Sequence, residues 1–103
     1  MQILAQVSIF PVGSGESVSK YVARSLGIVE NSGLPYTVGS MGTCIEGEWE
    51  DVFKVVKDCF DKMASDNNRV YMVLTCDMRK GREGALTQKI DSLEKKLGHE
   101  LKK

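Results

Sequence analysis

The sequence predicts an α+β fold, in which strands and amphipathic helices pack around one hydrophobic core. Two observations support this class. Apolar residues alternate with a period of two in some segments and recur every three to four residues in others. The chain has 103 residues, enough for one core but too few for two. We therefore expect a single domain over residues 1–98, followed by a frayed tail at residues 99–103.

The N-terminal segment predicts a strand followed by a helix. Apolar and mixed side chains alternate over residues 2–10, and Pro11 removes a backbone donor, so the strand should end there. Residues 16–32 then carry apolar side chains at helical spacing. Ser17 is a suitable N-cap for this helix, and Gly33 is a suitable stop.

A hairpin is predicted after the first helix. Residues 36–38 and 43–45 are short β-prone runs, and Gly39 and Gly42 lie between them. Glycines in this position are typical of a bulged strand pair that uses positive φ angles.

The second half of the chain predicts helix, strand and helix. An apolar stripe from Trp49 to Met63 indicates an amphipathic helix that ends in the polar cluster at residues 65–68. Residues 69–79 are the longest β-prone run, which we interpret as a central strand. A last helix is closed by Gly98, and its apolar positions are Leu86, Ile90, Leu93 and Leu97.

The order of these elements matches a known arrangement. Strand, helix, strand, strand, helix and strand form the split βαβ pattern of the ferredoxin-like fold, here with an additional C-terminal helix. Two helices cover only one face of such a sheet, which leaves the other face open. By alternation, the open face should carry Leu4, Gln6, Ser8 and Phe10, together with Tyr71, Val73, Thr75 and Asp77. This mixed surface predicts a homodimer or homotetramer whose sheets face each other.

Composition argues against several classes of partner and cofactor. Fourteen basic and fourteen acidic side chains give no net charge, so nucleic acid is not an expected partner. No apolar run approaches the roughly 20 residues of a membrane-spanning helix, and the start MQILAQVSIF lacks the pattern of a signal peptide. We expect a cytosolic protein that does not bind membranes.

Candidate catalytic and metal-binding residues are few. The three cysteines are widely spaced without a CxxC pair, which indicates neither a disulfide framework nor a zinc site. His99, the single histidine, lies in the tail and offers no general base. Glu46, Glu48 and Glu50 are best explained as first-turn glutamates of the second helix. We therefore expect no catalytic residue, no metal site and no cofactor.

Two small-residue stretches indicate a ligand site. PVGSGES, at residues 11–17, precedes a helix and is similar to a phosphate-cradling turn, although a flexible connection with a capping serine explains it better. In the second stretch, at residues 36–49, Met41 suits an apolar pocket, although ordinary core packing is the favoured explanation for this residue alone. Asp77 ends a strand beside Thr75, where it can accept hydrogen bonds from an amino-substituted ring or pair with a nearby cation.

Four segments carry a resemblance to a known family. PVGSGESVSKYV, SMGTCIEGEW, TCDMR and LTQKIDSLEKKL follow in an order that resembles the MTH1187/YkoF-like family of thiamine-binding proteins. The similarity extends from Ile3 to Leu97, and its most specific part is GTCIEG at residues 42–47. It implies a ferredoxin-like fold, dimers or tetramers assembled through their sheets, and binding of thiamine or its hydroxymethylpyrimidine moiety without catalysis.

Matched by position, the resemblance also implies a site. Its residues are Gly13 and Ser14 in the first turn, Met41, Gly42, Thr43 and Ile45 in the hairpin, and Asp77. Met41 and Ile45 suit the flat face of an aminopyrimidine, whereas Ser8, Thr43 or Asp77 suit its polar edge. We expect both glycine-rich stretches to form the rims of one cleft on the open sheet face. The alternatives are an oligomeric interaction protein with an incidental cleft and, less favoured, a small enzyme for phosphorylated compounds.

Overall fold

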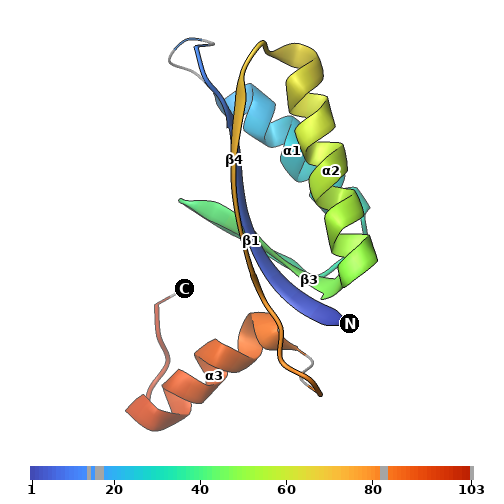
Figure 1. Cartoon of the computed structure of the whole chain (residues 1–103). Coiled ribbons are helices and arrows are strands. Elements are labelled where there is room, and N and C mark those ends of the chain that lie inside the picture. Colours follow the sequence, from blue (N-terminus) through green and yellow to red (C-terminus); the bar gives the residue numbers. More distant parts are fainter. Residues whose placement is uncertain (14, 16–17, 82–83, 103) are drawn as a thin grey trace.

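The computed structural model describes residues 1–13, 15, 18–81 and 84–102, and it has the expected α+β, ferredoxin-like architecture (Figure 1). Its helices and strands follow one another in the order that the sequence predicts. They are β1 (Gln2–Pro11), α1 (Ser19–Asn31), β2 (Tyr36–Gly39), β3 (Gly42–Glu48), α2 (Trp49–Asp66), β4 (Val70–Asp77) and α3 (Ala85–Leu97).

The four strands form one antiparallel sheet in the order β2-β3-β1-β4. β1 is central and pairs with β3 on one side and with β4 on the other. Within the described residues, β4 pairs with β1 alone and so lies at an edge. Our expectation that residues 69–79 form a central strand was therefore wrong. A long apolar run indicates that a strand packs against other elements, as β4 packs against α2. It does not indicate how many strands pair with it.

The two faces of the sheet are those predicted by alternation. Residues directly opposite in an antiparallel pair point to the same face, and Phe10 is opposite Tyr71 while Ser8 is opposite Val73. These side chains lie on the open face, where the rings of Phe10 and Tyr71 pack with centroids 5.5 Å apart. Ile3, Ala5 and Val7 point to the other face and are buried.

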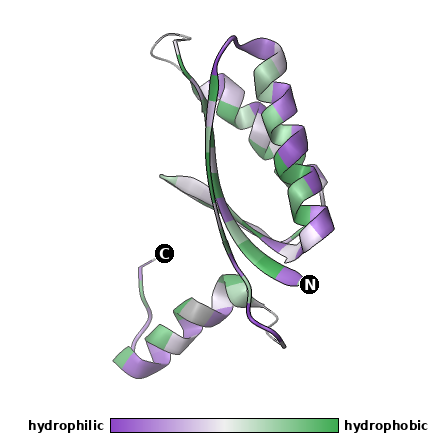
Figure 2. Ribbon diagram, in the orientation of Figure 1, coloured by the Kyte–Doolittle hydropathy of each residue, from purple (hydrophilic) through white to green (hydrophobic). Residues whose placement is uncertain are grey.

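Helices α1 and α2 lie side by side on this second face (Figure 1). The apolar side of α2 faces the sheet and its polar side faces solvent (Figure 2). The polar side includes two ion pairs at i,i+4 spacing, Lys54 with Asp58 and Lys57 with Asp61. The core between helices and sheet consists of Ile3, Ala5, Val7, Val29, Ile45, Val52, Val55, Val56 and Cys59.

Some local expectations need correction. Helix α1 begins at Ser19, later than residue 16, and Val18 occupies the N-cap position without a side-chain hydrogen bond. The expected cap, Ser17, lies outside the described residues. Gly39 and Gly42 do not have positive φ. Gly42 instead allows close approach, because an added Cβ would lie 3.1 Å from the carbonyl oxygen of Val7.

Helix α3 extends away from the layer formed by the sheet and the other two helices (Figure 1), and the Cα atoms span 46 × 29 × 21 Å. As expected, Gly98 ends it in a left-handed conformation and donates its N–H to Glu94 O. Beyond α3 the chain turns back, and the Leu101 N–H donates to the Glu94 carboxylate. Among the described residues, no helix is both long and apolar enough to cross a membrane.

The start of α3 is fixed to the sheet by Glu46. This residue lies in β3 and has only 7% of its surface exposed, so it is not the first-turn helix glutamate that we expected. Its Oε2 accepts a 2.5 Å hydrogen bond from the backbone N–H of Ala85, the first residue of α3. A carboxylate is favourable there because a helix N-terminus has free donors and a partial positive charge.

We predict that Glu46→Ala releases the start of α3. The Ala85 N–H loses its acceptor in a buried position, which costs about 1–3 kcal/mol locally. Hydrogen exchange of the Ala85 amide should accelerate in Glu46→Ala, and less in Glu46→Gln, which keeps an acceptor oxygen. Glu50→Ala, on the exposed surface of α2, is the control. Unchanged exchange at Ala85 in Glu46→Ala would contradict the assigned role.

Candidate functional site

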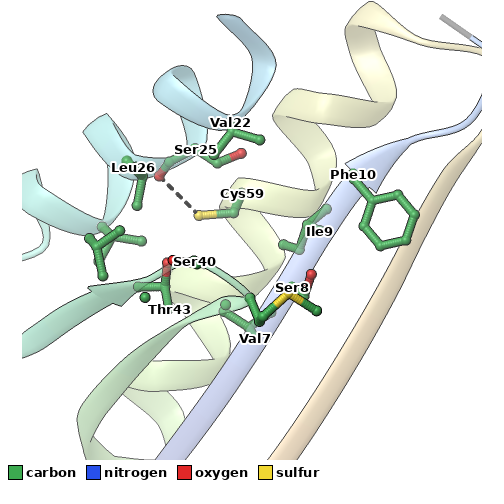
Figure 3. A pocket seen from close by; sticks show the side chains of 15 residues that line it. Val7, Ser8, Ile9, Phe10, Val22, Ser25, Leu26, Ser40, Thr43 and Cys59 are labelled. Carbon is green, nitrogen blue, oxygen red and sulfur yellow. Dashed lines mark hydrogen bonds between the residues drawn. The ribbon is translucent and has the colours of Figure 1, made fainter. Parts of the chain in front are cut away.

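A cavity of about 240 Å³ lies between α1, β1 and the tip of the β2–β3 hairpin (Figure 3). α1 provides one wall, the ends of β1 and the hairpin provide another, and Cys59 of α2 lies behind (Figure 3). The lining consists of Val7, Ser8, Ile9, Phe10, Val22, Ser25, Leu26, Val29, Val38, Gly39, Ser40, Met41, Gly42, Thr43 and Cys59.

Small residues at the hairpin tip keep this space open. Gly39 and Gly42 face each other at the end of the strand pair, and Ser40 and Met41 form the two-residue loop between them. Three of these four residues have at most two side-chain heavy atoms, so they cannot fill the volume under α1. The fourth residue, Met41, has a long side chain, but it is 85% exposed and therefore lies at the rim of the cavity.

The cavity carries no formal charge. Its lining includes no aspartate, glutamate, lysine, arginine or histidine among the described residues. Its ionisable group, the Cys59 thiol, donates a hydrogen bond to the carbonyl oxygen of Ser25 at 3.4 Å (Figure 3). Burial raises the pKa of Cys59 to about 11, so the thiol stays protonated at neutral pH.

Half of the residues that the sequence analysis selected meet here. Ser8, Met41, Gly42 and Thr43 come from β1 and the hairpin, and all four line the cavity. The hairpin returns along β1, so that Thr43 is directly opposite Val7. This register is what places the GTCIEG stretch beside Ser8.

The other selected residues lie elsewhere. Ile45 is fully buried in the core, and Gly13 is an exposed turn residue beyond β1. Asp77 is opposite Leu4, at the other end of β1 from the cavity. Ser14 lies outside the described residues.

The face that we expected for the cleft also needs correction. Thr43 is directly opposite both Val7 and Val38, so these three side chains are on the same face of the sheet. That face is the helix-covered one, because Val7 points toward the helices. The cavity is therefore under α1, on the helix-covered face, and not on the open face. The prediction used the positions at which the strands end. The face on which a cavity forms depends instead on the direction in which each side chain points.

Our sequence analysis missed the helical wall. The apolar side chains at helical spacing in residues 16–32 include Val22, Leu26 and Val29, which we used only to predict a helix, and neither Ser25 nor Cys59 was selected for the site. One signal was available, because Ser25 interrupts an otherwise apolar helical stripe at i+3 from Val22.

Other hollows are less suited to a specific ligand. A groove between α2 and β4 has almost no polar surface and is lined by Phe53, Val56, Lys57, Phe60, Met72 and Leu74. In the part of the chain that the structure describes, no three His, Cys, Asp or Glu residues are grouped so that they could hold a metal ion.

Fold and cavity together define a class, a ferredoxin-like protein with a small, uncharged cavity next to a glycine-rich hairpin. Comparison with known sequences identifies the family. Residues 5–94 match the family model described as thiamine-binding protein, and the chain belongs to this family. The resemblance seen in the sequence is thereby confirmed.

Relatives named UPF0045 proteins match over nearly their whole length. Mb1933 of Mycobacterium bovis is 37% identical over 98 residues, which cover 94% of this chain and 96% of the relative. MJ1052 of Methanocaldococcus jannaschii is 33% identical over 92 residues, which cover 89% and 92%.

Solved structures show the same fold. The crystal structure of MJ1052 superimposes with a TM-score of 0.83 at 33% identity and covers 89% of this chain and 95% of that one. TM0486 of Thermotoga maritima, named for a proposed place in thiamine biosynthesis or salvage, superimposes with a TM-score of 0.79. At 19% identity, over 90% of this chain and 99% of that one, TM0486 supports the fold alone.

We predict that Ile45 acts through the core. Ile45→Ala should lower the free energy of unfolding by about 2–5 kcal/mol, because it removes a fully buried side chain and leaves a void. Denaturant titration at one fixed protein concentration measures the effect. Thr37→Ala, at an exposed position of β2, should cost less than about 1 kcal/mol. Equal effects of the two substitutions would contradict the core assignment.

Proposed function

We propose that this protein binds the aminopyrimidine moiety of thiamine, as free hydroxymethylpyrimidine or as part of thiamine, in the cavity under α1. The observation that carries the proposal is the uncharged lining formed by the hairpin tip, α1 and β1. The family to which the chain belongs is described as thiamine-binding, which supports this ligand class. TM0486 is named for a proposed place in thiamine biosynthesis or salvage, which agrees with this ligand class.

Size and charge favour the pyrimidine ring over larger or phosphorylated compounds. The cavity of about 240 Å³ is smaller than the roughly 300–1,000 Å³ typical of sites for drug-sized ligands, so it suits a single ring. A phosphate would lose its hydration without meeting a cationic side chain among the described lining residues. A thiazolium would likewise stay at the mouth, near the exposed Met41.

The proposed role is binding without catalysis in the cytosol. Cys59 is the ionisable side chain of the lining, and its raised pKa of about 11 leaves little thiolate to act as a nucleophile at neutral pH. The free thiols of Cys44, Cys59 and Cys76 suit a reducing compartment. These properties support a protein that holds its ligand and leaves it chemically unchanged.

We predict that hydroxymethylpyrimidine and thiamine each raise the melting temperature, and that titration calorimetry gives saturable binding. A ligand at a hundred times its Kd stabilises the native state by about 2.7 kcal/mol. Hydroxymethylpyrimidine phosphate, whose phosphate is attached directly beside the ring, should bind at least about tenfold more weakly than hydroxymethylpyrimidine, a difference of about 1.4 kcal/mol. No heat and no thermal shift with hydroxymethylpyrimidine or thiamine would overturn the proposal.

A matched pair of variants locates the binding. Val22→Phe places a larger side chain in the cavity wall and should abolish binding. Ala23→Phe adds the same ring at the next residue of α1, which is exposed and outside the lining, and should leave binding unchanged. Equal binding by both variants would place the ligand elsewhere.

We also propose that the open face of the sheet is covered by a second copy of the chain. Tyr71 and Val73 are about half exposed on that face. On α3, Leu93 and Leu97 are 51% and 54% exposed, and α3 stands away from the sheet of its own chain (Figure 1). Two unpartnered apolar surfaces on one chain can cover each other across a twofold axis, as isologous interfaces do.

We predict a mass of at least a dimer in sedimentation equilibrium. Leu93→Lys combined with Leu97→Lys should shift the mass toward the monomer, because lysines replace the exposed apolar stripe of α3. Lys95→Asp, on the polar side of α3, is the control. A wild-type protein that is monomeric at all concentrations would contradict this assembly.

A further inference from the structure

The polar groups of the cavity lining differ in whether they already have a hydrogen-bond partner. The Cys59 thiol is engaged by the carbonyl oxygen of Ser25, at 3.4 Å. The hydroxyl oxygen of Ser25 itself is buried and has no hydrogen-bond partner among the residues that the structure describes. Ser25 is a residue of the cavity wall, so this unsatisfied oxygen lies beside the cavity, although its present rotamer leaves it no surface open to water.

Nothing in the fold requires a hydroxyl at this position. Serine inside a helix usually turns its hydroxyl back to a carbonyl of the preceding turn, and Ser25 does not make that bond. Its helical neighbours on the same wall, Val22, Leu26 and Val29, are apolar. Alanine would pack here without leaving an unpaired polar atom and has a higher helix propensity. The hydroxyl thus lowers the stability of the ligand-free protein.

We propose that Ser25 is the specificity-determining residue of the cavity, and that its hydroxyl turns into the cavity by rotation about χ1 and donates a hydrogen bond to an unprotonated ring nitrogen of the bound ligand. The ligand class is an uncharged nitrogen heteroaromatic ring, and this inference rests on the proposed pyrimidine-binding function. A serine hydroxyl has one donor and two acceptor positions, so it can also receive a bond from an amino group next to that nitrogen.

The opposite wall supports this orientation. Thr43 and Ser40 offer further hydroxyls on the hairpin side, and most of the other lining side chains are apolar (Figure 3). A flat ring can therefore direct one polar edge to α1 and its substituents to the hairpin. A site built to hydrogen-bond its ligand rejects an analogue without the matching atom, because the site's own polar group then stays unpaired.

The experiment compares hydroxymethylpyrimidine with its benzene analogue, in which both ring nitrogens are replaced by CH groups. Wild-type protein should bind the pyrimidine at least about tenfold more tightly, as expected for one buried hydrogen bond. In Ser25→Ala, affinity for the pyrimidine should fall about tenfold while affinity for the benzene analogue stays the same or rises. Ser25→Thr keeps the hydroxyl and should keep the preference.

A second measurement separates ligand recognition from a structural role. Without ligand, Ser25→Ala should melt at the same or a higher temperature than wild type, so stability and binding should change in opposite directions. Ser65→Ala, whose hydroxyl is bonded to Lys62 O outside the cavity, is the control and should not change ligand preference.

The outcomes distinguish the two proposals. If wild-type protein binds neither compound, the proposed function fails and the role of Ser25 fails with it. If wild type binds the pyrimidine but Ser25→Ala retains the full preference, the function stands and the role of Ser25 is overturned. A loss of affinity for both compounds together with a lower melting temperature would also overturn it, since Ser25 would then be structural.

Discussion

The structure depends on the alternation of side chains along β1. This strand is paired on both sides, so each of its residues must point either toward the helices or toward the open face. Ile3, Ala5 and Val7 supply the floor on which α1 and α2 pack. A shift of one residue in register would bury Gln2, Leu4 and Gln6 in their place, and both the core and the cavity floor would be lost.

The cavity results from an incomplete core at one end of this floor. Toward the N-terminus of β1, Ile45 and Val52 fill the space between sheet and helices completely. Toward its C-terminus the hairpin offers Gly39, Ser40 and Gly42, whose small side chains do not fill the space under α1. A void in a core is normally destabilising, and so is an unpaired buried hydroxyl. Both occur at the same place, which supports the binding role proposed for this region.

The sequence correctly predicted which face of the sheet each strand residue points to. It did not predict which distant segments contact each other. Alternation in β1 and β4 correctly assigned Phe10 and Tyr71 to one face, because period two is a local property. The edge position of β4 depends on pairings between distant segments, which no local pattern encodes. Glu46 illustrates the same limit, since its partner Ala85 lies 39 residues away. Ser25 could have been selected from the sequence, because a serine that interrupts an apolar helical stripe is visible there. That its hydroxyl lacks a hydrogen-bond partner among the described residues is seen only in the structure.

The arrangement assigns binding and assembly to opposite faces of one sheet. The proposed ligand site lies on the helix-covered face, whereas the surface proposed for assembly combines the open face with α3. Few residues connect the two regions, chiefly Ser8 and Phe10, which line the cavity from the open-face register of β1. Phe10 also packs against Tyr71 on that face. Substitutions on α1 therefore affect the ligand without touching the assembly surface, and substitutions on α3 do the reverse. This separation makes the two proposed properties independent of each other in experiment.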